Sequence, residues 1–224
     1  MGKNSMYWAG MDVHADKIQV AVYRDTEALP CDEYEVQTDA RSLGRLLKKL
    51  KSLQGEIRCV YEAGPCGYEL HRYLIDNGIL CEITAPALIP KKAGDRVKTD
   101  RRDARNLGLL YRSGMLTMIY VLDAEQEAAR DLVRAREDAV EDVRRKKHHL
   151  CKFLLRHGHR YRDGKQWTQA HGQWLKAIEF GNISLKTVFD GYTLALELAN
   201  EHLARLTKAI EEISITPGHQ KYVS

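Results

Sequence analysis

Four carboxylates are placed where they could bind a divalent metal ion. Asp12 lies inside the first apolar segment, where a carboxylate is costly unless it is paired or bound to metal. Glu62 directly follows another apolar run, and Asp100 and Asp103 are three residues apart at the expected start of a helix, so both project from one face. A cation that bridges a substrate phosphate needs several hard oxygen ligands from different elements. Two such ions can activate a nucleophile and stabilise a leaving oxygen in phosphoryl transfer.

Spacing alone leaves other interpretations of these residues open. Asp100 and Asp103 stand in the segment KTDRRDAR, where both could pair with neighbouring arginines or cap a helix. Glu62 could be an ordinary loop carboxylate beside a turn. His14, two residues after Asp12, is either a turn residue or a group that lies behind the metal ligands.

The amino-terminal half has the pattern of strands paired by a hairpin, followed by alternating helices and strands. Strands are expected at 7–13, 18–23, 33–37, 57–61 and 79–84, and helices at 40–53, 68–76 and from about 99 to 113. Thr38 is the expected N-cap of the first helix. This order predicts a mixed sheet flanked by helices. It is the order of the α/β ribonuclease-H-like fold, although the pattern alone also allows other α/β arrangements.

After residue 123 the pattern becomes helical. Residues 124–156 form one long helical candidate without Gly or Pro, and residues 184–213 form a second with Ser184 as its cap. A connection that carries His, Trp and Gly, residues 157–182, joins the two. We therefore expect an all-α region to follow the α/β domain.

The second long helix carries an apolar seam. The seam residues follow 4-3-4-3-4-3 spacing: Tyr192, Leu196, Ala199, Leu203, Leu206, Ile210 and Ile213. This is the a/d pattern of a coiled coil or of an antiparallel helical hairpin. Such a seam holds pieces together, so we expect self-association of the chain, as a dimer or a higher oligomer.

The net charge of +4 is small but unevenly distributed. From Lys91 to Arg112 there are eight Lys or Arg against three Asp, and from Arg144 to Lys165 there are nine against one. Two basic blocks indicate an anionic partner that meets particular surfaces, although a solvated face would give the same counts. We expect nucleic acid to contact the following residues: Lys91, Lys92, Arg96, Lys98, Arg101, Arg102, Arg144, Arg145, Lys146, Lys147, Arg156 and Arg160.

Trp167 lies in the connection, next to the second basic block. Its ring could stack on an unpaired base, or it could anchor the connection onto the helices. Five histidines in this region could suggest a metal cluster, but their Lys and Arg neighbours fit a nucleic-acid-binding face better than a set of metal ligands: His148, His149, His157, His159 and His171.

The composition argues against several classes of protein. No apolar run approaches the roughly eighteen residues that a membrane helix needs, and the first residues lack the basic and apolar regions of a signal peptide. The five cysteines form no CxxC pair and are odd in number, so they fit neither a zinc site nor a disulfide framework. We expect a cytoplasmic protein with reduced thiols and no membrane partner.

Four segments resemble one known family. They are GMDVHADKIQVAV, YEAGPCGYEL, APALIPKKAGDRVKTDRRDA and ARDLVRAREDAVEDV. The sequence resembles the insertion sequence 110 family of DEDD transposases, which includes pilin-gene inversion recombinases. The resemblance extends from about Tyr7 to Trp174, and more weakly to Ile213. The combination of YEAGPCGYEL with GDRVKTDRRDA is highly specific to this family.

The resemblance implies a RuvC-like, ribonuclease-H-type domain at 6–122 and a coiled-coil assembly region at 123–216. It implies a magnesium-dependent DNA recombinase or transposase that moves an insertion sequence. Its implied partners are the duplex DNA of the element ends and target, a structured guide RNA and other copies of itself. The implied catalytic residues, which bind Mg2+ or in its place Mn2+, are Asp12, Glu62, Asp100 and Asp103.

The chain departs from the family in one respect. The family's carboxy-terminal transposase domain, which supplies a nucleophilic serine, is absent, and neither Ser184 nor Ser214 matches a family motif. We therefore assign no nucleophilic serine and expect that this chain cannot complete strand exchange alone. Two alternative functions remain open: a non-cleaving module that binds RNA or DNA and oligomerises, and a junction-resolving nuclease.

Overall fold

The computed structural model describes residues 5–90 and 99–215. The chain divides into two compact units, Met1–Val121 and Leu122–Ser224. Among the described residues, no helix combines the length and the apolar character that crossing a membrane requires.

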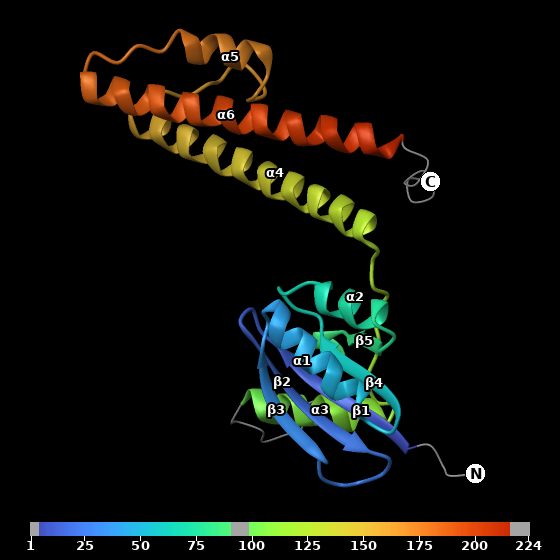
Figure 1. The fold of residues 1–224 in the computed structure, drawn as a ribbon. Helices are drawn as coiled ribbons and strands as arrows, with labels where there is room; N and C mark the ends of the chain where they lie inside the picture. The colour runs from blue at the N-terminus through green and yellow to red at the C-terminus, as the bar shows by residue number, and fades with distance from the viewer. Residues whose placement is uncertain (1–4, 91–98, 216–224) are drawn as a thin grey trace. The chain divides into compact units, whose positions relative to one another are not determined.

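One five-stranded mixed sheet forms the centre of the amino-terminal unit (Figure 1). Its strands are β1 (Ser5–Val13), β2 (Lys17–Arg24), β3 (Asp32–Gln37), β4 (Gly55–Glu62) and β5 (Leu80–Thr84). In the order β3-β2-β1-β4-β5, the first three strands pair antiparallel, whereas β1 with β4 and β4 with β5 pair parallel. Strands β1, β2 and β4 carry runs of buried residues, because both faces of the sheet are covered.

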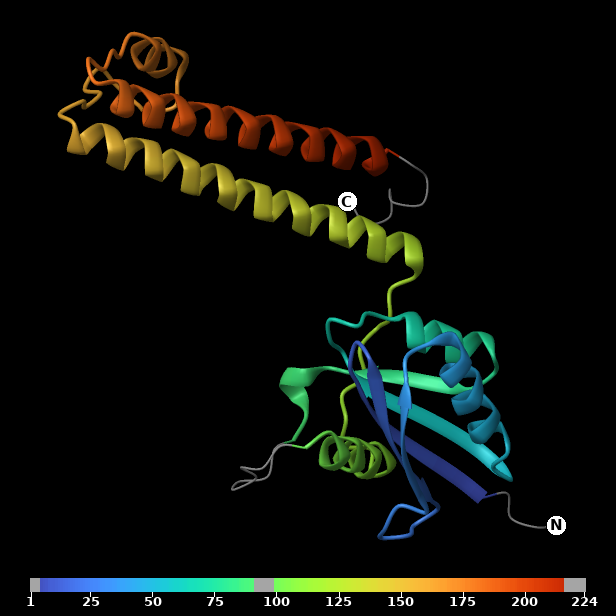
Figure 2. The ribbon, with the colours of Figure 1, turned by 60° about the vertical axis from the view of Figure 1, so that its left-hand side comes forward.

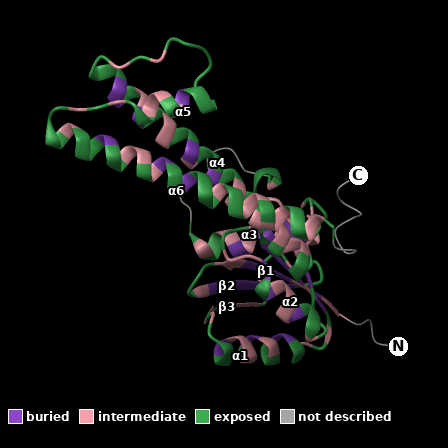
Figure 3. Cartoon of the chain, turned by 90° about the horizontal axis from the view of Figure 1, so that it is seen from above, coloured by how far each residue is buried: buried purple, intermediate pink, exposed green. Residues whose placement is uncertain are grey.

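Helices cover both faces of this sheet (Figures 2 and 3). Helices α1 (Ala40–Lys51) and α2 (Glu69–Asp76) lie on one side, and α3 (Asp100–Arg112) lies on the other. A 3-10 turn, η1 (Pro86–Leu88), follows β5. A mixed sheet flanked by helices in this order confirms the predicted ribonuclease-H-like fold class.

Two glycines allow α3 to lie directly on β1. A Cβ atom added to Gly10 would lie 2.1 Å from the carbonyl oxygen of Ala104 and 2.3 Å from the backbone nitrogen of Gly108. A Cβ atom added to Gly108 would lie 2.9 Å from Cδ2 of the Tyr23 ring. Backbone atoms cannot rotate away as a side chain can, so residue 10 must be glycine for this approach.

A largely buried carboxylate ties α3 to the edge strand β3. The Glu33 side chain is 11% exposed and accepts hydrogen bonds from Arg105 and from Nη2 of Arg101, the latter at 2.7 Å. The bonds from Arg105, which have the larger effect, and from Arg101 lower the pKa of Glu33 from its ordinary 4.5 to about 2. The pair of bonds therefore stabilises the docked helix whenever Glu33 is ionised.

The carboxy-terminal unit is an antiparallel helical hairpin with one short extra helix (Figure 1). Its helices are α4 (Ala124–Arg156), α5 (Gln169–Lys176) and α6 (Ile183–Ser214). Nε of Arg136 donates to Oγ1 of Thr207 at 3.1 Å, and further along α4 the rings of His149 and Tyr192 lie 6.3 Å apart between centroids. The two contacts show that α4 and α6 run antiparallel to each other.

The apolar seam of α6 faces α4 within the same chain. Leu196 and Ala199 are buried in one cluster with Val143 and Phe153 of α4, among others, and further seam residues pack against it while partly buried. The expected all-α region is present, and its seam is used by a hairpin, one of the two arrangements that the spacing allows. Self-association stays a prediction.

Two cap predictions in these elements were wrong. Asp39, not Thr38, caps α1, because its carboxylate accepts two backbone N–H bonds of the first turn; Oγ1 of Thr38 donates instead to the carbonyl of Ala15 at 2.7 Å. Asn182, not Ser184, caps α6, and its side chain accepts the Ser184 N–H at 2.8 Å. Helix α5 lies within the connection 157–182, where no helix was predicted.

Replacing Gly10 with Ala is expected to destabilise the amino-terminal unit by about 3 kcal/mol, because overpacking against backbone atoms forces strand and helix apart. Urea unfolding followed by circular dichroism measures the loss. Gly44→Ala is the matched control, because nothing lies within 4 Å of a Cβ at that residue of α1. The control should stabilise the helix by up to about 1 kcal/mol. Equal effects of both substitutions would contradict the close contact.

Glu33→Gln is expected to cost about 2 kcal/mol of stability at pH 7, after allowance for the solvent exposure of its two arginine partners. Because folding lowers the pKa of Glu33, its contribution is complete above about pH 4.5 and is lost as the pH falls toward 2. The difference in unfolding free energy between wild type and variant should therefore shrink across this window. Glu69→Gln removes a carboxylate that is 88% exposed and paired with Arg72, and it should change little at any pH. A wild-type advantage that persists unchanged at pH 2 would refute this role of Glu33.

Candidate metal centre

Asp12 and Glu62 stand at the carboxyl ends of two neighbouring parallel strands. The register of β1 and β4 places each of them one residue beyond the last pair of backbone partners. Trp8 and Val60, earlier on the same strands, pack against Tyr111 of α3. Because alternate residues of a strand share a face, Asp12 projects toward the side of the sheet that α3 covers. Glu62, at the end of its strand, lines a cavity that residues of α1 and α2 also line.

Asp100 and Asp103 both lie in the first turn of α3. Thr99 caps this helix, since its side chain accepts the N–H of Arg102 at 3.3 Å and its carbonyl accepts the N–H of Asp103 at 3.0 Å. Acidic residues in a first turn are favoured by the helix dipole. The close contact of α3 with β1 brings this turn to the strand end that carries Asp12.

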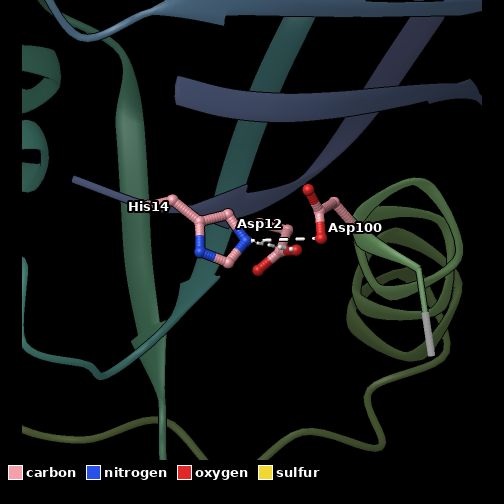
Figure 4. A group of neighbouring side chains, drawn as sticks. All are labelled: Asp12, His14 and Asp100. Atoms are coloured by element: carbon pink, nitrogen blue, oxygen red, sulfur yellow. Dashed lines mark hydrogen bonds and ion pairs between the residues drawn. The ribbon is translucent and has the colours of Figure 1, made fainter. Parts of the chain in front are cut away.

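Asp12, His14 and Asp100 converge on one point (Figure 4). Nε2 of His14 lies 3.1 Å from Oδ2 of Asp12 and 3.5 Å from Oδ1 of Asp100. One donor atom of each residue lies within 4.8 Å of the others. The side chains of Asp12, Asp100 and His14 are 20%, 37% and 45% exposed, so an ion from solution can reach them.

Lys17 contributes a positive charge to this group. Its Nζ lies 2.8 Å from Oδ2 of Asp100 and 3.2 Å from Oε2 of Glu35. The hydrogen bond from Lys17 lowers the pKa of Asp100, and the bonds to Asp100 and then Glu35 raise the pKa of Lys17. Asp100 is therefore ionised at neutral pH, with Oδ2 on Lys17 and Oδ1 toward His14.

The structure brings together part of the predicted carboxylate set. Asp12 and Asp100 belong to the convergent group, and Glu62 lines a cavity of about 830 Å³ together with Asp12 and His14. Asp103 lies in the same helical turn as Asp100, and its Oδ2 is buried. Within the described part of the chain, neither Glu62 nor Asp103 joins the donors that lie within 4.8 Å of one another. Their role as ligands stays a prediction.

The donors that do converge suit a divalent cation. Carboxylate oxygens bind Mg2+ and Mn2+, and an imidazole nitrogen binds transition metals. Two carboxylates and one imidazole within reach of each other therefore fit the kind of ion that the family resemblance implies.

His14 and Lys17 belong to the group although the sequence analysis did not assign them to the site. The available signal for His14 is its spacing from Asp12, because residues two apart at a strand end project to the same face. The role of Lys17 has no local signal, since its partner Asp100 is distant in sequence and reaches it through the packing of α3.

One predicted nucleic-acid-binding block falls partly on described residues. Arg101 is bonded to Glu33, yet its side chain is 62% exposed. Arg102 is also exposed. The other predicted contacts of this block lie outside the described residues: Lys91, Lys92, Arg96 and Lys98.

The basic block on α4 is exposed but locally paired. Arg144 lies 2.8 Å from Glu141, and Arg145 lies 2.6 Å from Asp142, each about one helical turn away. Both arginine side chains remain well exposed, and such pairs contribute little to stability, so they can exchange a carboxylate for a phosphate. The other predicted residues here are exposed or half-buried: Lys146, Lys147, Arg156 and Arg160.

Trp167 packs onto the helical unit. Its ring centroid lies 4.9 Å from that of His171, and Nζ of Lys147 lies 5.0 Å from it. Trp167 has a φ of 67°, a left-handed conformation that is rare for a bulky residue. Together with Trp174 it is partly buried against the α4–α6 core. The anchoring role is therefore present, and base stacking stays a prediction.

Comparisons with known proteins agree on a family. Residues 9–158 match the family model of the IS110-type DEDD proteins, which is described as a transposase. The transposase for insertion sequence element IS1533 of Leptospira borgpetersenii is 35% identical over 218 residues, or 96% of this chain and 63% of that protein. The protein y4qE of Sinorhizobium fredii (strain NBRC 101917 / NGR234) is 42% identical over 146 residues, or 65% of this chain and 37% of that protein.

The chain thus spans less than two thirds of the length of either relative. Among solved structures, T. thermophilus RuvC in complex with a Holliday junction substrate matches with a TM-score of 0.36 and 14% identity, over 52% of this chain and all of that one. The family match alone covers more than half of the sequence. On that ground, this chain belongs to the IS110-type DEDD transposase family.

Proposed function

We propose that this chain is the metal-binding, nuclease-like part of a DNA transposase that moves an insertion sequence. The observation that supports this most directly is the convergence of Asp12 and Asp100 at the carboxyl end of β1, in a member of this family. The proposed division is a RuvC-like domain at 6–122 and a helical assembly region at 123–216. The proposed catalytic residues, which hold Mg2+ or in its place Mn2+, are Asp12, Glu62, Asp100 and Asp103.

The arrangement of these side chains supports the proposal of phosphoryl chemistry at this site. A bound divalent ion supplies a Lewis acid that polarises phosphate oxygens and activates a nucleophile. Asp12 presents its carboxylate from a strand that is paired on both sides, and Asp100 presents Oδ1 while Lys17 holds Oδ2. Glu62 and Asp12 line a cavity of about 830 Å³ that residues of α1 and α2 also line, and it has room for a phosphodiester beside Asp12.

Nucleic acid is the partner that the exposed basic residues support. Arg144 and Arg145 project from α4, and Arg101 projects from α3 with most of its side chain in solvent. Cationic side chains of this kind position a nucleic acid through its phosphates without reading its sequence. The proposed partners are the duplex DNA of the element ends and target and a structured guide RNA, and the proposed place of action is the cytoplasm.

A non-cleaving binding module is the second candidate function. It is favoured by the convergence of only two of the four predicted carboxylates among the described residues. In that case α4 would hold RNA or DNA, and the helical unit would self-associate as a dimer or a higher oligomer. The chain spans 63% and 37% of the lengths of the two relatives described above. We therefore propose for this chain a part of the transposition reaction and not the complete reaction.

Mg2+ or Mn2+ is expected to raise the Tm of the protein, because a cation relieves the repulsion between converging carboxylates. At an ion concentration a hundred times Kd, the gain should be about 5 °C or more. Asp12→Asn should remove most of this gain, as differential scanning calorimetry with and without the ion would show. Asp76→Asn, an exposed carboxylate at the end of α2, is the control and should keep the full gain.

Equal metal stabilisation of the wild type and Asp12→Asn would contradict the assigned site. A magnesium-dependent cleavage assay on branched duplex DNA then separates the two candidate functions. Cutting by the wild type and not by Asp12→Asn supports the nuclease part, whereas normal metal stabilisation without cutting supports the binding module.

Arg144→Gln combined with Arg145→Gln should weaken binding of structured RNA and duplex DNA. If both arginines contact phosphates, the slope of log affinity against log salt should fall by roughly 0.9 per lost contact to a duplex. The control removes two charges from α6, where Arg205→Gln and Lys208→Gln change residues outside both predicted blocks. Affinities and slopes that match the wild type would show that the block on α4 is a solvated face.

A further inference from the structure

We propose that His14 is a third ligand of the ion held by Asp12 and Asp100, and that its nitrogen makes the site favour Mn2+ over Mg2+. This inference rests on the proposed function, since it requires a divalent ion at these carboxylates. It adds a nitrogen donor to a ligand set that the family pattern presents as oxygen alone.

The separations between the donor atoms suit a single ion. Neighbouring ligand atoms about 2.1 Å from an octahedral ion lie about 3.0 Å apart, and opposite ones about 4.2 Å apart. Nε2 of His14 lies 3.1 Å from Oδ2 of Asp12 and 3.5 Å from Oδ1 of Asp100, and all three donors lie within 4.8 Å of one another. Small side-chain movements therefore bring all three onto one ion.

His14 reaches this point from a fixed backbone. It follows the last pair of the β1–β2 hairpin, Val13 with Ile18, and its own N–H donates to the carbonyl of Lys17 at 2.9 Å. The ring is 45% exposed, and its Nε2 is directed at both carboxylates (Figure 4). The hairpin thus presents the imidazole without burying it in the core.

Lys17 leaves one oxygen of Asp100 for the ion. Its Nζ lies 2.8 Å from Oδ2, whereas Oδ1 faces His14. A group that binds the outer oxygen of a carboxylate fixes the direction of the inner one, as outer partners commonly do around metal sites. The resulting donor set is one oxygen from Asp12, one oxygen from Asp100 and one imidazole nitrogen.

The chemistry of these donors decides which ion is favoured. Mg2+ prefers oxygen ligands and retains its water molecules, whereas an imidazole nitrogen suits transition metals. A histidine in the set therefore shifts the preference toward Mn2+. If His14 instead only donated a hydrogen bond to Asp12 from outside the coordination shell, it would orient that carboxylate equally for both ions. The ratio of the Mn2+ and Mg2+ affinities would then not depend on His14.

Isothermal titration calorimetry of the full chain, which measures its affinities for Mn2+ and for Mg2+, tests this inference. His14→Ala should reduce the affinity for Mn2+ at least about tenfold, as losses of this size already follow removal of outer partners, and should affect Mg2+ much less. His14→Asp replaces the nitrogen with oxygen and should also lower the Mn2+ to Mg2+ ratio of affinities. His202→Ala, an exposed histidine on α6, should leave the ratio unchanged.

Pulsed electron paramagnetic resonance of bound Mn2+ gives a second readout that does not depend on affinity. The wild type should show coupling to a 14N nucleus, and His14→Asp should lose it. Bound Mn2+ without nitrogen coupling, together with an unchanged affinity ratio in His14→Ala, would overturn the role of His14 and leave the proposed function standing. Failure of the wild type to bind either ion would overturn both.

Discussion

The contact between Gly10 of β1 and the backbone of α3 sets the geometry of the amino-terminal unit. A single methyl group at this residue would lie 2.1 Å from a carbonyl oxygen of the helix, so no other side chain allows the same approach. The first turn of α3 thereby reaches the end of β1, where Asp100 meets Asp12, and Arg101 comes within reach of Glu33 on the edge strand. Because the contact joins backbone to backbone, the distance between the end of β1 and the first turn of α3 does not depend on side-chain rotamers.

The order of the elements follows from the sequence because apolar periodicity and turn residues are local properties. Alternating and continuous apolar runs mark the strands, and 3.6-residue periodicity marks the helices that flank them. The caps were harder, since Thr38 and Asp39 are adjacent candidates and only the chain path decides which side chain faces the first turn. Helix α5 was missed because its eight residues, with Gly172 among them, are too few to show a clear period.

The site and the seam depend on contacts between distant segments, which a sequence pattern does not specify. Asp12 and Asp100 could be named individually, and the spacing of His14 from Asp12 is a local signal, but the pattern contains no information on the contacts that His14 and Lys17 make with Asp100. Likewise, heptad spacing shows that Leu196 must be covered without showing what covers it. Here α4 of the same chain covers it, so the spacing alone did not determine an oligomer.

The bond between Lys17 and Asp100 gives the centre a counter-charge of its own. The ammonium group of Lys17 comes from β2, so the negative charge of Asp100 is neutralised when the domain folds and does not require a bound ion. Among the described residues, Asp12 has the His14 imidazole beside it and Asp100 has the Lys17 ammonium group. At the proposed metal site, we therefore expect that loss of an ion would leave one compensated carboxylate beside Asp12, so that the ion could exchange with solution while the domain stays folded.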